Sequence, residues 1–228
     1  METKKTIESM FSAGAHFGLG RSRRHPTVAP LIFGVKNGTD IFDLEKTVTL
    51  LENAQEFIAK LAKENKVVFF IGGKKEASAN IKAAADSLNM PYVNGRFIGG
   101  TLTNFGNIRR RVERYEKLIS DREKGELLKY TKRERSLIDK EIAKLEKMFL
   151  GVVSLKKIPD ALFVIDPRRE KNAIKEANDM GVPVIALSGS DCDVREVKYP
   201  IVGNDSSKAS IQFFVEAVAA AYKKAKVA

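Results

Sequence analysis

Two arginine clusters are the part of this sequence best suited to a chemical role. An arginine triplet at residues 109–111 precedes Arg114 in a charged segment. A second cluster lies beside glycines and comprises Arg21, Arg23 and Arg24. A guanidinium group binds phosphate oxygens through paired hydrogen bonds, and glycines let a phosphate chain approach the backbone closely. Both clusters therefore favour contact with nucleic-acid phosphates, although solvated loops and helix surfaces carry such charges as well.

The segment from Arg96 to Asn104 combines paired glycines, two threonines and an asparagine directly before an expected helix. A threonine or asparagine at a helix start commonly accepts a hydrogen bond from a first-turn amide, so Thr103 or Asn104 could simply cap that helix. The same residues could also form a backbone-rich surface that docks against RNA. The sequence leaves both interpretations open.

Features that would indicate catalysis are weak. Residues 72–75 (Gly-Gly-Lys-Lys) match neither common phosphate-binding glycine motif, so a tight strand-to-helix turn is expected. His16 and His25 lie in an expected loop without a carboxylate cluster, which argues against a metal site. Asp166 is expected to cap a helix that begins at a proline, and Cys192 lies between two aspartates that would raise its thiol pKa. We therefore expect no catalytic residue, no cofactor and no metal.

The composition is that of a globular, basic protein. Of the 228 residues, 43% are hydrophobic and 30% charged, so the chain can bury a substantial core. Lysines and arginines outnumber acidic residues by 40 to 29, which favours nucleic acid as a partner, then an anionic membrane surface. Charge alone leaves a basic enzyme open. One cysteine, no signal peptide and no long apolar run predict a cytosolic location.

Hydrophobic periodicity predicts an α/β fold. Asn37-Gly38 between two short apolar runs predicts a β-hairpin turn, and continuous apolar runs predict strands buried on both faces. The expected strands span residues 31–35, 39–42, 67–71, 92–93, 161–165, 184–187 and 199–202. The expected helices span residues 7–14, 43–65, 75–89, 168–180 and 206–224, and the expected loop spans 16–26. This alternation predicts a parallel sheet with helices on both faces.

Residues 104–150 interrupt the alternation and predict a helical hairpin. Apolar residues recur there at spacings of four, three and four, in Ile108, Val112, Tyr115 and Ile119 and again in Ile138, Ile142, Leu145 and Phe149. Two helices with one shared spacing predict an antiparallel coiled coil inserted into a core domain of residues 1–103 and 151–228. Thr131 and Glu134 predict a capping box. The 14 basic and 9 acidic residues of this segment leave the charge of its tip ambiguous.

Several of these segments resemble the bacterial small-subunit ribosomal protein S2 family. The resembling segments, in family order, are residues 15–18, 32–34, 37–38, 43–47, 99–104, 159–167 and 203–205. The stretches Gly-Gly-Thr-Leu-Thr-Asn and Pro-Asp-Ala-Leu-Phe-Val are the most specific parts of the resemblance. The chain departs from the family pattern at Leu19, where a histidine is common, at Phe97, and in the loop of residues 188–191.

The resemblance implies a Rossmann-like, flavodoxin-type parallel sheet with a protruding coiled-coil hairpin. It implies a non-enzymatic structural constituent of the small ribosomal subunit that binds rRNA at the junction of head and body and supports assembly and translation. It implies neighbouring proteins that include the large mRNA-capturing one, with no membrane and no small-molecule substrate. The alternatives are a nucleotide-dependent or RNA-modifying enzyme on the same sheet, or a membrane-surface or protein adaptor.

Together, the clusters and the resemblance predict which residues contact or adjoin the RNA. These residues are Arg21, Arg23, Arg24, Arg96, Thr101, Thr103, Asn104, Arg109, Arg110, Arg111 and Arg114. We expect the arginines to bind phosphates, and the threonines and the asparagine to lie near the docking surface. Such contacts supply position and affinity and do not read base sequence.

Overall fold

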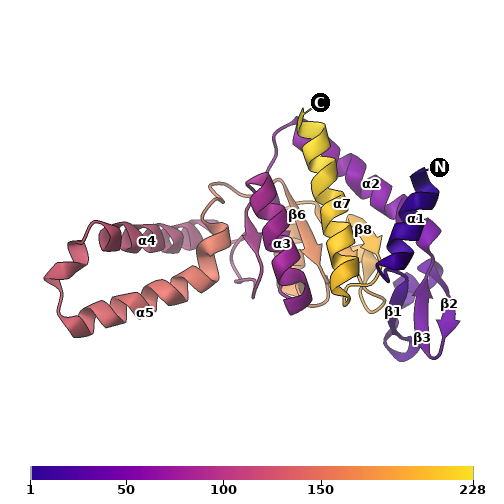
Figure 1. Cartoon of the computed structure of the whole chain (residues 1–228), viewed down its shortest axis with the longest axis horizontal. Coiled ribbons are helices and arrows are strands. Elements are labelled where there is room, and N and C mark those ends of the chain that lie inside the picture. The colour runs from indigo at the N-terminus through magenta and orange to yellow at the C-terminus, as the bar shows by residue number, and fades with distance from the viewer. Residues whose placement is uncertain (1, 228) are drawn as a thin grey trace.

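A five-stranded parallel sheet forms the centre of the fold (Figure 1). The computed structural model describes residues 2–227. The strands of the sheet are β4 (Val68–Ile71), β5 (Tyr92–Val93), β6 (Ala161–Ile165), β7 (Val184–Ser188) and β8 (Tyr199–Val202). They lie in the order β5-β4-β6-β7-β8, so the direction of winding reverses between β4 and β6. This is the strand order of a flavodoxin-like sheet, and the predicted α/β class is confirmed.

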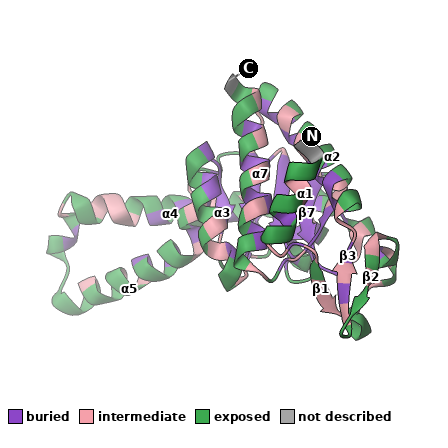
Figure 2. Cartoon of the chain, turned by 45° about the vertical axis from the view of Figure 1, so that its right-hand side comes forward, coloured by how far each residue is buried: buried purple, intermediate pink, exposed green. Residues whose placement is uncertain are grey.

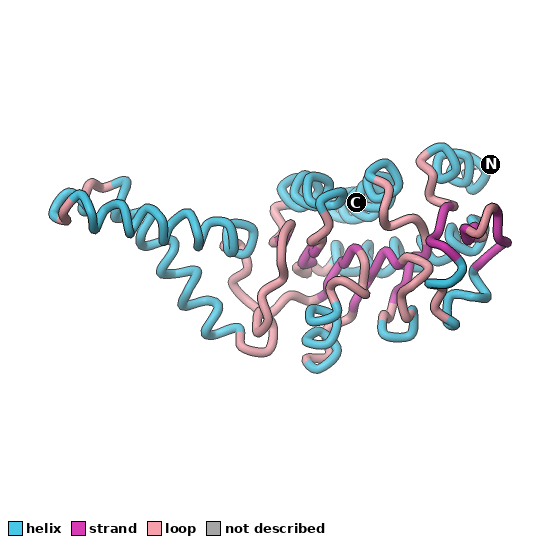
Figure 3. Tube along the Cα trace, turned by 90° about the horizontal axis from the view of Figure 1, so that it is seen from below, coloured by secondary structure: helices cyan, strands magenta, loops and turns pink. Residues whose placement is uncertain are grey.

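Helices cover both faces of this sheet (Figure 3). One face carries α2 (Leu44–Lys63), α3 (Lys75–Leu88) and α7 (Lys208–Val227), and the other carries α6 (Lys171–Asp179). Successive strand side chains alternate between the two cores. Phe70 and Phe163 lie in the first core, whereas Phe69 and Leu162 lie in the second, and all four are almost completely buried. Burial on both faces explains why the strand sequences are uniformly apolar.

Two helices, α4 (Phe105–Glu123) and α5 (Lys132–Phe149), project together from one end of the sheet (Figure 1). Near the sheet, Val112 and Tyr115 of α4 and Ile142 of α5 are buried and belong to the same core as α6. The predicted capping box is confirmed, because the Thr131 hydroxyl accepts from the Glu134 amide and the Glu134 carboxylate accepts from the Thr131 amide. The connection between α4 and α5 contains a further helical turn at Glu126–Lys129.

A second, antiparallel sheet, the small sheet, lies at the opposite end of the molecule (Figure 2). Its strands, β1 (Phe17–Gly20), β2 (Ile32–Lys36) and β3 (Thr39–Phe42), lie in the order β1-β3-β2. The predicted turn between β2 and β3 is confirmed, since φ is +51° at Asn37 and +76° at Gly38.

The prediction of a loop at residues 16–26 is wrong for β1, which pairs with β3. Glycines at alternate positions of β1 hide the apolar alternation that indicates a strand. Gly18 is needed for packing, because a Cβ there would lie 3.2 Å from both Cβ and the carbonyl oxygen of Asp40. The following Arg21–Arg23 segment forms a single 3₁₀ turn. The first helix, α1 (Glu2–Ser12), begins before the predicted residue 7.

Candidate nucleic-acid interface

The arginine triplet lies near the start of α4, where its three side chains have different surroundings. The Arg109 guanidinium lies 3.3 Å from each of the Glu113 and Glu116 carboxylates and donates a 3.3 Å hydrogen bond to the Val153 carbonyl oxygen. Arg110 and Arg111 are exposed, and neither has a hydrogen-bond or ion-pair partner within residues 2–227. Arg109 therefore links α4 to the segment after α5, while the side chains of Arg110 and Arg111 are available to an external anion.

Arg114 joins the two projecting helices. Its Nε donates to Glu141 Oε1 of α5 at 2.7 Å, and its Nη2 donates to Glu141 Oε2 at 3.2 Å. The paired hydrogen bonds raise the pKa of Arg114 above its ordinary value. Because both side chains are largely exposed, this pair contributes little to stability, and its main effect is to fix the geometry of α4 against α5.

The Gly-Gly-Thr-Leu-Thr-Asn segment wraps around the carboxylate of Glu176, a residue of α6. Glu176 Oε1 accepts from the Gly100 amide at 2.6 Å, and Glu176 Oε2 accepts from the Leu102 and Thr103 amides at 3.0 and 3.3 Å. The Thr103 hydroxyl also donates to this carboxylate, at 3.3 Å. Thr101 is 3% exposed, and its hydroxyl donates to the Ile98 carbonyl oxygen. Glu176 thus fixes the turn that leads directly into α4.

Neither Thr103 nor Asn104 caps α4 through its side chain. Asn104 is the N-cap residue by position, but its Oδ1 accepts a 2.7 Å hydrogen bond from the side-chain amide of Asn107. Asn104 and Thr103 are exposed on the side of the turn next to α4, while the buried Thr101 shapes the turn from inside. No sequence pattern indicated Glu176, because it lies 73 residues or more from the groups that it binds.

The second arginine cluster lies in the small sheet and also divides into free and occupied side chains. Arg24 donates to the completely buried Asp40 carboxylate through Nε, at 2.8 Å, and through Nη2, and this bonding raises the pKa of Arg24. The side chains of Arg21 and Arg23 are exposed, with no hydrogen-bond or ion-pair partner in the part of the chain that the structure describes. The first cluster lies where α4 leaves the core, and the second lies in the small sheet at the far end of the core, so the two do not form one continuous site (Figure 1).

Arg96 follows β5 at the carboxyl edge of the parallel sheet and is exposed, again with no partner among residues 2–227. It lies three residues before the turn bound by Glu176, and thus on the same side of the molecule as α4. Arg96 therefore lies in the segment that leads into α4, whereas Arg21 and Arg23 lie in the small sheet.

The carboxyl edge also holds an ion network that the sequence did not reveal. Lys74 Nζ lies 2.8 Å from Asp166 Oδ2 and 2.7 Å from Asp205 Oδ2. Burial alone would lower the pKa of Lys74, but the two carboxylates outweigh it and raise the pKa. Burial raises the pKa of Asp205 despite the nearby ammonium group. Doubly wound sheets hold nucleotides where the winding reverses. In this chain Lys74, from the loop after β4, lies at that place and is paired with Asp166 and Asp205.

Asp166 and Cys192 have structural surroundings near this network. Asp166 has φ +63°, and its Oδ1 accepts from the Arg169 amide at 3.1 Å, so it caps the turn before α6, which begins only at Lys171. Cys192 is buried, and burial is the largest cause that raises its thiol pKa, with nearby carboxylates adding to it. A thiol with a raised pKa is a poor nucleophile.

The two histidines lie in aromatic and turn contacts. His16 stacks between Phe11 and Phe17, with ring centroids 4.3 and 4.0 Å away, and burial lowers its pKa. His25 Nδ1 lies 2.7 Å from the Thr27 hydroxyl. Across residues 2–227, no group of three or more His, Cys, Asp or Glu side chains is arranged to hold a metal ion. Within the same residues, no helix has the length and apolar character needed to cross a bilayer.

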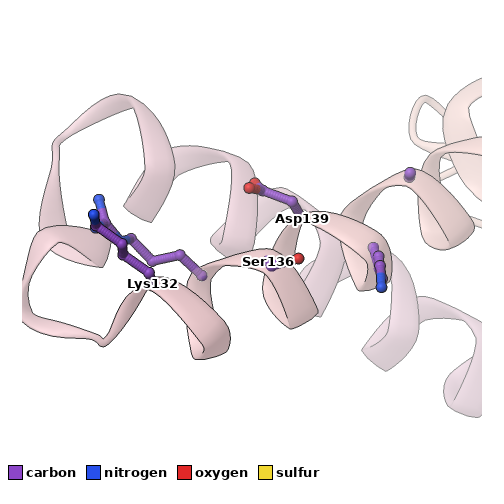
Figure 4. Close-up of a pocket in the computed structure, with 6 residues that line it drawn as sticks. Lys132, Ser136 and Asp139 are labelled. Atoms are coloured by element: carbon purple, nitrogen blue, oxygen red, sulfur yellow. The ribbon is translucent and has the colours of Figure 1, made fainter.

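The tip of the projection mixes charges of both signs. A hollow on α5 is lined by Lys132, Arg135, Ser136, Asp139, Lys140 and Ala143 (Figure 4). The Nε of Arg135 is buried without a hydrogen-bond partner, but the Asp139 carboxylate lies in the same lining. The tip is therefore a weaker candidate for phosphate contact than the base of α4, defined as residues 105–114.

These features define a class: a basic α/β protein whose free arginines lie on open surfaces, as in a nucleic-acid-binding scaffold. Residues 10–225 match the sequence profile of the family described as ribosomal protein S2. The small ribosomal subunit protein uS2 of Coprothermobacter proteolyticus is 39% identical over 214 residues, which cover 94% of this chain and 80% of that protein. Its counterpart from Dictyoglomus thermophilum is 39% identical over 220 residues, covering 96% and 89%. The chain belongs to the ribosomal protein S2 family.

Proposed function

We propose that this chain is a structural constituent of the small ribosomal subunit, where it binds rRNA and supports subunit assembly and translation. The family match carries this proposal, because it spans the parallel sheet, the small sheet and the projecting helices. The formal charge of +11 suits a partner made of phosphates. Membership of the ribosome places the chain in the cytoplasm, with rRNA and other ribosomal proteins as partners.

The exposed arginines without internal partners make the phosphate contacts in this proposal. On one side these are Arg96, Arg110 and Arg111, and on the other they are Arg21 and Arg23. Because the parallel sheet lies between the base of α4 and the small sheet, the two sets would touch two separate stretches of RNA. Contacts of this kind fix the position of the protein and do not read base sequence.

The projecting helices act as an antiparallel coiled-coil strut in this proposal. The strut is an insertion of residues 104–150 between the two parts of the core domain, 1–103 and 151–228. Its apolar seam and the Arg114–Glu141 pair hold α4 against α5. A strut anchored in the core of the sheet would present Arg110 and Arg111 to RNA at a fixed orientation, which reduces the entropy lost on binding.

Protein neighbours, including the large mRNA-capturing protein, are part of the proposal as well. The structure offers them an aromatic surface made of Phe11, Phe17 and Phe33, whose side chains are 61%, 47% and 78% exposed. The pairing of β2 with β3 shifts between Ile32 and Gly34, so Phe33 is an extra residue in β2 without a partner in β3. The next residue of β2, Gly34, pairs with Ile41, which also pairs with Phe17 of β1. Exposed aromatic groups are typical of protein-binding surfaces.

The enzyme alternative is not favoured. The match to a family of structural ribosomal proteins argues against it. The place where a doubly wound sheet would hold a nucleotide contains the Lys74–Asp166–Asp205 network, which would have to be broken before a nucleotide could use Lys74.

Sedimentation through a sucrose gradient tests the proposed function. A tagged copy of the chain, expressed in cells, is expected to sediment with small ribosomal subunits. A variant in which Arg96, Arg110 and Arg111 are all replaced by Gln should shift toward the top of the gradient. A wild-type chain that never enters the small-subunit fraction would contradict the proposal.

A further inference from the structure

Three loops meet at the carboxyl edge of the parallel sheet, where the winding reverses. The Gly73 amide, after β4, donates to Glu170 Oε1, after β6, at 3.2 Å. The neighbouring Gly72 amide donates to the Val93 carbonyl oxygen of β5 at 2.9 Å. A Cβ at Gly73 would lie only 2.6 Å from the Gly95 carbonyl oxygen, so the loops are in direct contact and leave no room for a larger residue.

Each of these loops carries exposed cations at its surface. The cations, here called the basic rim, are Lys75, Arg96, Arg169 and Lys171. Lys75 lies two residues beyond Gly73, Arg96 is adjacent to Gly95, and two of the cations flank Glu170 on either side. In the described chain, none of the four side chains has a hydrogen-bond or ion-pair partner.

The acids near the basic rim are mostly engaged elsewhere. Asp166 and Asp205 share Lys74, Asp191 lies 2.6 Å from the Arg168 guanidinium, and Glu170 accepts the Gly73 amide. Burial raises the pKa of Glu170, which weakens its tendency to carry a charge. Glu76 is the exposed acid nearest in sequence, so the surface keeps an excess of positive charge.

We infer that the basic rim binds a run of RNA backbone phosphates, as a second contact continuous with the base of α4. The inference rests on the proposed ribosomal function and adds Lys75, Arg169 and Lys171 to its contacts. Doubly wound sheets commonly bind the phosphates of a nucleotide at this edge. Here the internal ion network engages Lys74 below the surface, so the cations that remain free point outward, toward an extended polyanion.

The geometry favours phosphate contact without base recognition. The rim consists of long cationic side chains on closely packed loops. The helix α3 begins there at Lys75, and the side chain of its N-cap residue, Lys74, does not cap the helix. Helix N-terminal amides and arginine side chains both attract phosphate oxygens. Arg96 leads along the chain into the turn bound by Glu176 and then into α4, which makes the two surfaces one path for an RNA strand.

The test measures binding of the full chain to protein-free small-subunit rRNA over a range of salt concentrations. The rim variant replaces Lys75, Arg96 and Arg169 by Gln. The matched control replaces Lys63, Lys223 and Lys224 by Gln, which removes the same charge at exposed positions near the opposite edge of the sheet. That edge is identified by the Tyr222 hydroxyl, which donates to the Lys66 carbonyl oxygen just before β4.

The rim variant is expected to lower the slope of log affinity against log salt by about two, since each lost phosphate contact removes roughly 0.7 to 0.9. The control should keep the wild-type slope. A charge-preserving variant with Arg96→Lys and Arg169→Lys should also keep most of the slope. Thermal melting of all variants checks that each is folded.

The outcomes separate this inference from the function on which it rests. If the rim variant keeps the wild-type slope while Arg110→Gln/Arg111→Gln lowers it, the rim inference is wrong and the ribosomal function stands. If the wild-type chain does not bind rRNA at all, the proposed function itself fails. Calorimetry with inorganic phosphate and with ATP distinguishes the phosphate source: micromolar binding of either, abolished in the rim variant, would overturn assignment to RNA.

Discussion

The base of α4 and the small sheet each contain a cluster of arginines, but the arginines that already have partners bind different kinds of acid in the two places. At the base of α4, Arg109 and Arg114 pair with surface acids of the projecting helices. In the small sheet, Arg24 instead neutralises Asp40, which is completely buried. Each region keeps two arginines free, Arg110 and Arg111 in one and Arg21 and Arg23 in the other. The number of arginines in a cluster therefore overstates how many can reach an external phosphate.

The surfaces around the free arginines differ as well. The base of α4 continues into the basic rim and has no exposed large hydrophobic side chain among residues 105–114. The small sheet lies beside Phe11, Phe17 and Phe33, which are exposed. A purely charged surface suits RNA alone, whereas charge next to exposed aromatic rings also suits a protein neighbour. This contrast is the reason for assigning both RNA and protein contacts to the small sheet.

The largest expected effect comes from Lys74, which ties the loop after β4 to the loop before α7. That second loop holds the N-terminal segment, because the Asn204 side chain donates to the Gly14 carbonyl oxygen. Lys74→Met would leave the Asp166 and Asp205 carboxylates without a counter-charge and lower the free energy of unfolding by about 3 kcal/mol. Urea unfolding measures the loss. The neighbouring exposed Lys75→Met is the control and should change stability by less than about 0.5 kcal/mol.

The next effect isolates the base of α4. Glu176→Ala would leave the Gly100, Leu102 and Thr103 amides without their acceptor and cost about 2 kcal/mol, since hydrogen bonds to charged groups are among the stronger ones. It should also weaken rRNA binding without changing the salt slope, because no phosphate-binding cation is lost. Lys175→Ala, a neighbouring exposed position, is the control for stability. An unchanged rRNA affinity would show that the turn does not position α4 for binding.

The direct comparison of the two regions uses paired arginine variants. Arg110→Gln/Arg111→Gln and Arg21→Gln/Arg23→Gln should each lower the log–log salt slope for rRNA binding by about 1.5. Because the parallel sheet separates the two regions, the two losses should add. Arg109→Gln, whose guanidinium is already engaged, should leave the slope nearly unchanged. If only the Arg110→Gln/Arg111→Gln variant lowers the salt slope, the small sheet does not contact rRNA phosphates and would be assigned to protein contact alone.

Much of the fold follows from local sequence patterns, and the remainder depends on distant partners. Periodicity predicted the strand–helix alternation, and Thr131 with Glu134 predicted a helix start, because these signals involve residues a few positions apart. The strand β1 was missed because glycine at Gly18 reflects close packing against Asp40 and resembles a loop signal.

The occupied arginines could not be identified for the same reason. Arg24 finds its acid 16 residues away, and Arg114 finds Glu141 27 residues away. Lys74 binds Asp205 across 131 residues. No periodicity records such pairs. For the basic rim, position along the chain was the usable signal. Basic residues in the loops after buried strands, such as Lys75 and Arg169, fall at the carboxyl edge where α/β sheets bind ligands.

The aromatic surface gives an effect on partner binding with little effect on stability. Phe33→Ser should change the free energy of unfolding by less than about 0.5 kcal/mol, because the side chain is 78% exposed. It should leave rRNA binding intact while reducing the amount of the large mRNA-capturing protein that co-purifies with small subunits containing the variant. Met180→Ser, an exposed apolar position at the C-terminal end of α6, is the control. Equal co-purification from both variants would remove the aromatic surface from the proposal.

The smallest effect concerns pH, on the side of the molecule that contacts the N-terminal segment. Hydrogen bonds from the Arg195 side chain, then from its amide, lower the pKa of Asp193 from 3.8 to about 2. A depressed pKa in the folded chain means that the stabilisation is complete above pH 3.8 and is lost as the pH falls toward 2. Since the Arg195 side chain is 75% exposed and solvent screens the pair, the loss should be small. Carboxyl titration by NMR measures the pKa directly, and Arg195→Gln should return it toward 3.8. A pKa that stays near 2 in that variant would assign the shift to the backbone amide of residue 195, which the substitution keeps, and would remove the ion pair as its main cause.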